Sequence, residues 1–479
     1  MRTAYSVETV RAAERELMAR LPEGALMLRA AAGLSAACAD LLGRVYGSRV
    51  VLLVGSGDNG GDALYAGARL ARRGAGVTAV LLSPERAHAG GLAALRRAGG
   101  SVAGVDGAEG LIERADLVVD GIVGIGGKGG LRSEAVPLAR AADRARAAVV
   151  AVDLPSGVDA GTGEVRGAAV RADLTVTFGT HKPGLLVDPA REYAGSVRLV
   201  DIGLELPDGG AELEALQHAD VAALLPLPAP ESDKYRRGVV GIAAGSARYP
   251  GAAVLAVAGS LRGGAGAVRY VGPAADAVIA RFPETLVSDQ GPRRAGRVQA
   301  WVVGPGAGDD ADTVAEVLRA DVPVLVDADG LRLAPQKAVR ERSAPTLMTP
   351  HAGEAAALLG VSREEVEGAR LGAARELAAR YGATVLLKGS TTLVADARSG
   401  AAVRVNATGT GWLATAGSGD VLSGLSGSLL AAGLPARDAG SVGAYLHGLA
   451  GRLAADGAPV GAHDVAEAIP AAWRDVRRQ

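Results

Sequence analysis

The sequence predicts an α/β protein of two domains, each a mainly parallel sheet with helices on both faces. Short β-branched runs alternate with helical or glycine-rich stretches along the chain, which is typical of parallel strands joined by crossover helices. A chain of 479 residues is also too long for one hydrophobic core. The alternating series is interrupted once, by a proline-rich segment between residues 204 and 238. These observations together predict two sheets and one boundary.

Composition argues against some classes of partner. The chain has 51 basic and 52 acidic residues and no long block of either sign, so we expect neither nucleic acid nor a membrane surface as a partner. The aromatic share of 3% argues against platforms for stacking bases. The single cysteine, Cys38, excludes an internal disulfide and a cysteine-based zinc site, and we expect it to be a small buried apolar group.

The N-terminal stretch reads as a charged helix without the apolar core of a signal peptide. No run approaches the length of a membrane span, so we expect a cytoplasmic protein. Helical periodicity covers Thr9–Met18 and Met27–Leu42. The first strand is Arg49–Val54, and further strand-like runs lie at Val77–Leu82, Leu117–Val119, Ala148–Val152, Leu174–Phe178 and Val197–Val200.

Glycines and polar residues gather where these strands end. The first strand is followed by Gly55-Ser56-Gly57-Asp58-Asn59-Gly60-Gly61-Asp62, which opens a helix over Ala63–Arg73 and is not a G-x-G-x-x-G fingerprint. Three later strand ends carry Asp120 with Gly124–Gly130, then Asp153–Asp159, then Gly179–Gly184. Ligands bind at the carboxyl ends of parallel strands, so four such loops in order predict a site.

The proline-rich connector, with Pro226, Pro228 and Pro230, marks the domain boundary. We place the domains at residues 1–210 and 211–479, with a short helix over Glu212–Leu224 opening the second. The second series has strands at Val239–Ala243, Ala267–Val271, Trp301–Val303, Val322–Val326, Thr346–Met348 and Val385–Leu387. A helix over Ala252–Arg262 follows the first of them, and Ala436–Asp456 is expected to be the last helix.

Polar loops follow these strands too, and one stretch stands out. Gly417-Ser418-Gly419-Asp420 precedes a helical apolar pattern, so its backbone N–H groups would form a helix N-terminus that suits a phosphate or an oxyanion. We expect the helix dipole to hold Asp420 ionised, ready to accept a proton from a hydroxyl. Alone, this motif is also compatible with ordinary helix capping.

Both halves resemble known families. In the second half, Gly245–Ala253, GPGAG (Gly304–Gly308), TPHAGE (Thr349–Glu354), KGSTT (Lys388–Thr392) and AGSGDVLSG (Ala416–Gly424) resemble the NAD(P)H-hydrate dehydratases of the ribokinase-like superfamily. In the first half, GSGDNGGD, DGIVGIGG, DLPSGVDAGTGE and TFGTHKPG resemble the NAD(P)H-hydrate epimerases. The order is that of the bacterial bifunctional repair enzymes, which implies a Rossmann-like N-terminal and a ribokinase-like C-terminal domain.

The resemblance implies roles for residues of the first half. Asn59, Asp120 and Ser156 would bind K⁺, and Asp153 would be the acid/base near C6 of the hydrated nicotinamide. The predicted hydrate-binding residues of this half are Asp58, Asn59, Gly60, Gly61, Asp62, Gly124, Ile125, Gly126, Gly127, Lys128, Gly129, Gly130 and Asp153. The family usually has asparagine where this chain has Asp58, which adds negative charge near a phosphate-bearing ligand.

In the second half, the resemblance makes Asp420 the base that deprotonates the C6 hydroxyl while it attacks the terminal phosphate of ADP. Glu354 would act through Mg²⁺. The hydrate would contact Ala253, Gly306, His351 and Asp420, and the nucleotide would contact Lys388, Gly389, Ser390, Thr391, Thr392 and Gly419. Trp412 stands where smaller residues are common. The expected partners are NADHX, NADPHX and ADP, and we expect a homo-oligomer.

Two other interpretations stay open at this point. The second half could be a kinase of a small alcohol such as hydroxyethylthiazole, although that predicts neither the first domain nor His351 in the metal motif. The chain could also be a nucleotide-binding regulatory module without turnover, which would have no need of a general base such as Asp420.

Overall fold

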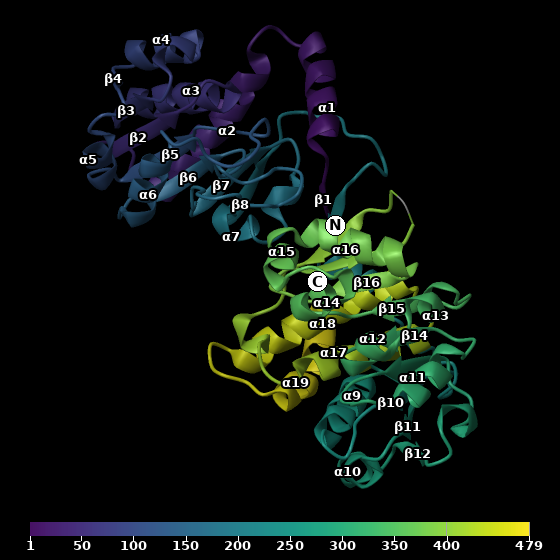
Figure 1. Ribbon diagram of the computed structural model, residues 1–479. Helices are drawn as coiled ribbons and strands as arrows, with labels where there is room; N and C mark the ends of the chain where they lie inside the picture. The colour runs from purple at the N-terminus through teal and green to yellow at the C-terminus, as the bar shows by residue number, and fades with distance from the viewer. Residues whose placement is uncertain (399, 479) are drawn as a thin grey trace. The chain divides into compact units, whose positions relative to one another are not determined.

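The computed structural model describes residues 1–398 and 400–478, which form two compact units (Figure 1). Thr3–Leu213 make up the N-terminal unit. The C-terminal unit starts at Glu214 and also includes Met1–Arg2. The division of the chain into domains at residues 210 and 211 stays a prediction.

The N-terminal unit is built on a seven-stranded sheet in which every neighbouring pair is parallel. Three strands have the predicted bounds, whereas the short edge strand β4 was not predicted. In sheet order the strands are β4 (Ser101–Ala103), β3 (Gly76–Leu81), β2 (Arg49–Val54), β5 (Leu117–Gly121), β6 (Ala148–Val152), β7 (Leu174–Phe178) and β8 (Ser196–Val200).

Helices cover both faces of this sheet, as predicted. Leu52 and its alternate neighbours on β2 pack in one core cluster with residues of α2, α3 and α4, whereas Leu53 packs in another with residues of α5 and α6. The helices are α1 (Val7–Arg20), α2 (Ala25–Leu42), α3 (Asp58–Arg72), α4 (Ala89–Arg97), α5 (Ala108–Glu113), α6 (Val136–Arg144) and α7 (Arg191–Ala194).

Helix α2 corrects one expectation. It is the one described helix that is long and apolar enough to cross a membrane by length and composition, although the sequence analysis found no such run. Its residues Leu34 and Cys38 are fully buried in the core of the N-terminal unit, and burial raises the pKa of the Cys38 thiol to about 12. Core helices pass the same test of length and composition, so α2 is weak evidence for a membrane span.

The C-terminal unit contains an eleven-stranded sheet that is parallel from β12 to β16, and β17 runs antiparallel to both of its neighbours, β16 and β18. Its five short strands at or near the edges were not predicted. In sheet order the strands are β1 (Arg2–Ala4), β9 (Leu213–Ala215), β18 (Val403–Asn406), β17 (Thr392–Ala395), β16 (Thr384–Leu387), β15 (Thr346–Met348), β14 (Val324–Val326), β13 (Ala300–Val303), β10 (Val239–Ala243), β11 (Ala267–Val271) and β12 (Leu286–Ser288).

Helices again lie on both faces of this sheet (Figure 1). One layer, packed together in a large core, comprises α8 (His218–Leu224), α9 (Pro250–Arg262), α10 (Ala275–Arg281), α17 (Ser418–Ala431), α18 (Ala436–Ala455) and α19 (Ala462–Val476). The others are α11 (Ala311–Leu318), α12 (Asp329–Leu333), α13 (Gln336–Arg340), α14 (Ala352–Leu359), α15 (Arg363–Gly368) and α16 (Arg370–Tyr381).

Two predicted elements of this unit are wrong. The segment Glu212–Leu224 is strand β9 followed by helix α8, because Gln217 and Asp220 form a capping box that starts the helix at His218. Helix α18 is not the last helix, since α19 follows it.

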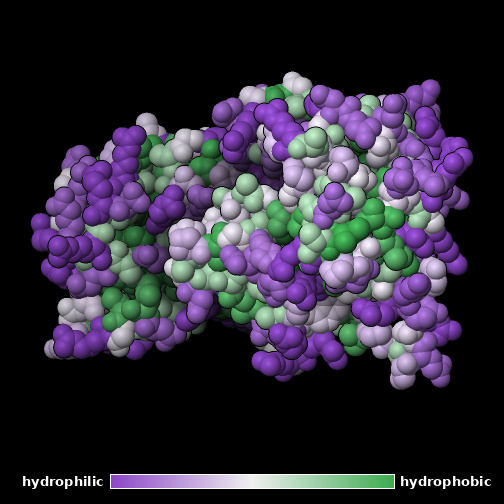
Figure 2. Space-filling view, turned by 90° about the horizontal axis from the view of Figure 1, so that it is seen from below, coloured by the Kyte–Doolittle hydropathy of each residue, from purple (hydrophilic) through white to green (hydrophobic). Residues whose placement is uncertain are grey.

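The surface mixes polar and apolar residues. The face seen in Figure 2 is mostly hydrophilic, with hydrophobic residues gathered in patches between the charged ones. Exposed apolar side chains include those of Tyr46, Ile279 and Leu453.

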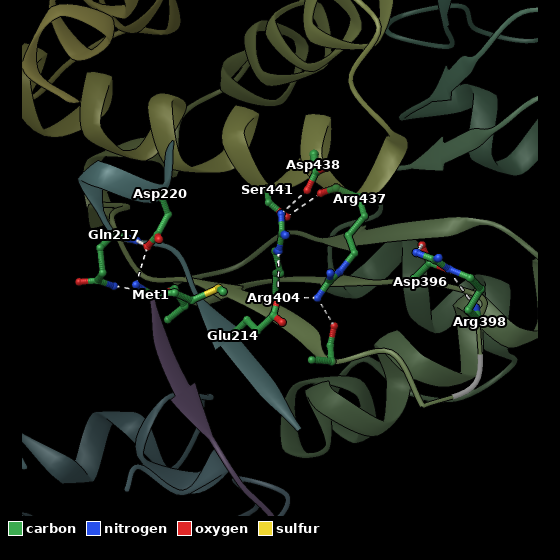
Figure 3. A network of polar contacts seen from close by, with 12 residues as sticks. Met1, Glu214, Gln217, Asp220, Asp396, Arg398, Arg404, Arg437, Asp438 and Ser441 are labelled. Atoms are coloured by element: carbon green, nitrogen blue, oxygen red, sulfur yellow. Dashed lines mark hydrogen bonds and ion pairs between the residues drawn. The ribbon is translucent and has the colours of Figure 1, made fainter. Parts of the chain in front are cut away.

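A polar network ties β9 and β18 to α18 (Figure 3). Glu214 Oε2 accepts hydrogen bonds from Arg404 Nε at 3.2 Å and Arg437 Nη2 at 2.8 Å, and Arg404 also pairs with Asp438. Beside it, the α-amino group of Met1 lies 2.8 Å from Asp220 Oδ2. The edge of the sheet is therefore secured by ion pairs rather than by apolar packing alone.

Candidate active sites

A cavity of about 810 Å³ opens at the carboxyl ends of β2, β5 and β6 in the N-terminal unit. Neighbouring parallel strands end at one edge of a sheet, so loops far apart in the sequence meet here. Helix α1 completes the wall. Of the predicted site residues, the cavity is lined by Asp58, Asn59, Asp62, Gly124, Ile125, Gly126, Gly127, Lys128, Gly130 and Asp153.

Asp153 lines this cavity and is held there by hydrogen bonds from two side chains. Its Oδ1 accepts hydrogen bonds from Lys182 Nζ at 2.5 Å and Thr177 Oγ1 at 3.0 Å. Its backbone φ is +66°, a left-handed conformation that a non-glycine residue adopts at a cost. Strain of this kind persists where the surrounding structure holds the residue in place, and it is found preferentially at functional sites. The geometry therefore suits a carboxylate held in one orientation at the cavity wall.

Lys182 and helix α1 were not predicted to belong to the site. Lys182 is 1% exposed and also donates to Thr177 Oγ1 and the carbonyl of Phe178, both at 3.0 Å. Helix α1 contributes Arg11 and Glu14 to the cavity lining. Burial raises the pKa of Glu14, while the charge of Lys182 opposes this shift. Lys182 lies in the motif TFGTHKPG, and its position in this motif is the sequence feature that could have predicted it as a site residue.

The glycines that follow β2 and β5 differ in their contacts and in whether they line the cavity. A Cβ on Gly124 would lie 2.2 Å from Asn59 Oδ1, so only glycine lets the loop after β5 approach the start of α3. Gly60, Gly61 and Gly129 do not line the cavity. A Cβ on Gly60 would lie 2.4 Å from the carbonyl oxygen of Gly55, so this glycine permits close packing of the backbone.

Two of the predicted K⁺ ligands, Asp120 and Ser156, are fully buried and do not line the cavity, whereas the third, Asn59, lines it. Fully buried Asp120 accepts hydrogen bonds from the backbone N–H and the hydroxyl of Ser156, both at 2.7 Å. Burial raises the pKa of Asp120 to about 6. Asn59 donates through Nδ2 to the carbonyl of Val152 at 2.5 Å, and its Oδ1 faces Gly124. Three oxygen-bearing side chains, from the start of α3, the end of β5 and the loop after β6, thus gather in a small region.

In the C-terminal unit, Gly417 with φ of +86° precedes α17, and Ser418-Gly419-Asp420 form its first turn. Asp420 departs from one expectation, because its pKa is raised to about 7 rather than held low by the helix dipole. Burial is the main cause and the charge of Asp327 the next, while Lys388 opposes them. Desolvation and like charge therefore outweigh the dipole.

Lys388 lies at the centre of a charged cluster over this helix N-terminus. Its Nζ is 2.7 Å from Asp327 Oδ1 and 3.8 Å from Glu354 Oε2. Asp327 is 1% exposed and its Oδ2 also accepts a hydrogen bond from Ser423 Oγ at 2.6 Å. Asp327, which follows a predicted strand, was not predicted to be a site residue. The cluster brings together Lys388 from the loop after β16, Glu354 from the first turn of α14 and Asp420 from the first turn of α17.

The predicted nucleotide loop connects β16 to β17. Buried Arg370 of α16 donates through Nη2 to the carbonyls of Lys388 at 2.9 Å and Thr391 at 3.1 Å. A Cβ on Gly389 would lie 2.2 Å from the same Nη2. Arg370, which was not predicted, therefore fixes the backbone of this loop through its carbonyl groups. The loop also includes Ser390, and Thr392 is the first residue of β17.

His351 and Glu354 together cap helix α14. His351 Nδ1 accepts from the N–H groups of Gly353 and Glu354, and Glu354 Oε2 accepts from the N–H of His351 at 2.8 Å. The cap fixes Glu354 beside Lys388. Ala253 is fully buried in α9, and a Cβ on Gly306 would lie 2.7 Å from that of Ala252, so the GPGAG loop touches the same helix.

Comparison with known proteins identifies a family for each half of the chain. Residues 240–471 match the family described as NAD(P)H-hydrate dehydratase, and residues 23–184 match the YjeF-related protein N-terminus. The bifunctional NAD(P)H-hydrate repair enzyme Nnr of Mycobacterium leprae is 51% identical over 92% of this chain and 91% of its own length. The Nnr of Corynebacterium glutamicum is 39% identical over 90% of this chain and 87% of its own length.

A solved structure is similar to the C-terminal unit. The ADP/ATP-dependent NAD(P)H-hydrate dehydratase of Bacillus subtilis, co-crystallised with ATP and Mg²⁺, is 30% identical, with a TM-score of 0.50. The match covers 54% of this chain and 97% of that one. With both family matches in this order and 51% identity to a bifunctional relative over 92% of the chain, the chain belongs to the family of bifunctional NAD(P)H-hydrate repair enzymes.

Proposed function

We propose that this chain repairs hydrated NADH and NADPH in two reactions at its two sites. The N-terminal unit interconverts the R and S epimers of NADHX and NADPHX, and the C-terminal unit dehydrates the S epimer with ADP, giving AMP and phosphate. The main support is that one chain has both kinds of site. The N-terminal cavity contains Asp153, held by Lys182, and the first turn of α17 contains Asp420.

The chemistry of the hydrate explains why two sites are needed. C6 carries a hydroxyl next to the ring nitrogen, so the nitrogen can expel the hydroxyl and water can return to either face. A dehydratase that accepts one epimer leaves the other behind. Asp153 at the cavity wall is the group we assign to proton transfer near C6, and the loop Gly124–Gly130 offers backbone N–H groups to the pyrophosphate.

The residues around Asp120 fit the K⁺ that the family resemblance implies. The partners of this fully buried carboxylate are the neutral N–H and hydroxyl of Ser156 and the N–H of Ile122. Hard oxygen ligands suit such a cation. Asn59, Asp120 and Ser156 would hold it, and its charge would offset that of Asp120.

At the second site, Asp420 removes the proton from the C6 hydroxyl as that oxygen attacks the terminal phosphate of ADP. The N–H groups of Ser418 and Gly419 and the ammonium of Lys388 stabilise charge on the transferring phosphoryl group. Phosphate then leaves C6 more readily than hydroxide would, and elimination restores the nicotinamide. The loop Lys388–Thr392 would hold the nucleotide, and Ala253, Gly306 and His351 are the residues that the family resemblance assigns to the hydrate.

Glu354 fits a role toward Mg²⁺. Mg²⁺ needs only one or two protein carboxylates when it is held with phosphates. Among the described residues there is no group of three or more acidic, histidine or cysteine side chains that would form a complete metal cage. Glu354, which the α14 cap fixes beside Lys388, would supply one ligand, and the bound Mg²⁺ would neutralise phosphate charge.

We also propose that the protein is cytoplasmic and forms a homo-oligomer. NADH and NADPH, whose hydrates it repairs, are soluble metabolites, and the hydrophobic patches seen on the face in Figure 2 offer apolar surface for self-association.

The test is turnover of an equimolar mixture of R- and S-NADHX. With ADP, we expect absorbance of NADH to rise until both epimers are consumed, with AMP and phosphate formed in equal amounts. Asp420→Asn should lower this rate at least about a hundredfold, because the general base is lost, while epimers still interconvert. The variant keeps Ser418, Gly419 and Lys388, so it should still bind ADP. Measured ADP binding therefore shows that the loss of rate is not a loss of nucleotide binding.

Other outcomes would select the alternatives. Phosphorylation of hydroxyethylthiazole with ATP, and no NADH, would indicate a small-alcohol kinase. Nucleotide binding without turnover would indicate a regulatory module. Dehydration by Asp420→Asn within about tenfold of the wild-type rate would show that Asp420 is not the base.

A further inference from the structure

A second carboxyl group of the N-terminal cavity has surroundings opposite to those of Asp153. Asp62 lies on α3, lines the cavity and is 6% exposed. Its Oδ1 is buried without a hydrogen-bond partner among the described residues. A buried carboxylate oxygen without a partner is costly, so this position favours the protonated form or awaits a ligand.

Negative charges are the strongest electrostatic neighbours of Asp62. Asp153, Asp58 and Glu14 all act on it, from the loop after β6, the first turn of α3 and helix α1. Burial is the main cause that raises the pKa of Asp62 well above its ordinary value, and these three carboxylates add to the shift. The charged and titratable groups around the cavity also include Arg11 and Arg15 of α1, Lys128, and His88 at the start of α4, which packs on α3.

Asp153 is held in the opposite way. Lys182 pairs with its Oδ1, and Thr177 donates to the same oxygen. A buried ammonium partner stabilises the ionised carboxylate. The cavity therefore holds one carboxyl group with a buried oxygen that has no partner among the described residues, and one carboxyl group paired with a buried lysine. Two groups with such different surroundings are the arrangement that separates an acid from a base.

We infer that Asp62 is a catalytic residue of the epimerase, the general acid that works opposite Asp153. The inference rests on the proposed function. Asp62 donates its proton to the C6 hydroxyl, the C6–O bond breaks, water leaves, and the ring nitrogen supplies the electron pair for a C6=N bond. A water molecule then adds to C6 from the other face, and Asp153 takes its proton.

The pair carries one proton in total, so the reverse reaction uses the same groups with their roles exchanged. Exchange with solvent then returns a proton to Asp62 and removes the proton from Asp153. Because the C6–O bond breaks, each epimerisation replaces the hydroxyl oxygen with one from water.

The test uses the full chain without nucleotide, so that only epimers interconvert, followed by chromatographic separation of R- and S-NADHX. Asp62→Asn should lower kcat at least about a hundredfold with KM within about threefold, because the amide fits the space but donates no acidic proton. Wild-type kcat should fall as the pH rises and Asp62 loses its proton. Incorporation of ¹⁸O from labelled water should accompany epimerisation.

Two comparisons make the result specific. Asp143→Asn, on the exposed side of α6, makes the same substitution away from the cavity and should leave the rate unchanged. Asp58→Asn removes a charge from the same cavity and should change KM, while the loss of activity at high pH remains. Dehydration of S-NADHX with ADP and the thermal unfolding temperature of the same Asp62→Asn chain report whether it is folded.

The outcomes separate the inference from the proposed function. If the wild-type chain does not interconvert the epimers, the proposed function fails. If it does and Asp62→Asn retains kcat within about threefold, the inference is wrong. Should Asp62→Asn be unfolded, a wild-type rate that does not fall with rising pH overturns the inference.

Discussion

Asp420 combines two properties that a general base for a hydroxyl needs. It stands in the first turn of α17, beside the N–H groups that would hold the transferring phosphate, and its pKa is raised to about 7. A base is most efficient when its pKa lies near the working pH, because it is then both available and strong enough to accept a proton.

This property predicts the pH dependence of dehydration. The base works only when deprotonated, so kcat/KM for S-NADHX should rise with pH up to about 7 and level off above it. Below that value it should fall about tenfold per pH unit, because the ionised fraction falls by that factor. The measurement is the rate of NADH formation at saturating ADP between pH 5 and 9. A rate that stays level down to about pH 5 would contradict the raised pKa.

Single residues were predictable where a motif carries them. Asp153, Asp62 and Asp420 stand in short glycine-rich motifs, and the structure places all three at the two sites. Their partners were not predictable, because Lys182 and Asp327 meet these residues only after distant strands pair. The protonation state of Asp420 also depends on burial and on Asp327, which the local helix does not reveal.

At the scale of elements, helix α17 owes its position to glycines as much as to its apolar residues. A Cβ on Gly424 would lie 1.9 Å from the carbonyl oxygen of Ala256 in α9, and one on Gly259 would lie 2.2 Å from that of Val421. The two helices therefore pack backbone to backbone. This contact fixes the position of the first turn of α17, which contains Asp420.

We expect Gly424→Ala to push α17 away from α9. The methyl group cannot be accommodated beside a backbone carbonyl, so the free energy of unfolding of the C-terminal unit should fall by about 1–3 kcal/mol, and dehydration should slow while epimerisation continues. Gly372→Ala is the control, since Gly372 is exposed on α16 with no atom within 4 Å of a new Cβ. That change should stabilise or leave the unit unchanged, by urea unfolding. Equal losses in both variants would contradict the packing argument.

Buried elements were predictable to within a few residues, and edge elements were not. Strands such as β2, β6 and β10 are continuous apolar runs, and their bounds match the prediction. Strands β4, β12 and β18 are three or four residues long and partly exposed, so their sequences lack such a run. Helix α1 was predicted, but its place at the cavity depends on tertiary packing that periodicity alone does not specify.

At the scale of the whole molecule, each unit contains its own sheet and its own site. The cavity around Asp153 is lined by residues between 11 and 178, and the cluster around Lys388 is formed by residues between 327 and 423. Neither site therefore needs a residue from the other unit. Fusion would then serve joint expression and local supply of the usable epimer.

We expect residues 1–210 and 211–479, expressed apart, each to fold and keep its own reaction. The second piece loses the ion pair between Met1 and Asp220, which should lower its stability by no more than about 1 kcal/mol because the pair is partly exposed. On an equimolar mixture of epimers with ADP, it should stop when the S epimer is consumed, and adding the first piece should complete the reaction. Consumption of both epimers at similar rates by the second piece alone would contradict this division.

The edge strand β1 has a consequence for synthesis on the ribosome. Met1–Arg2 belong to the C-terminal unit, and β1 lies beside β9, yet residues 3–213 are made in between. Domains generally fold as they emerge, with the N-terminal one first. The nascent chain can thus finish its first domain while Met1–Arg2 still lack a partner strand. The outer edge of the second sheet is then closed last, by residues made before the first domain.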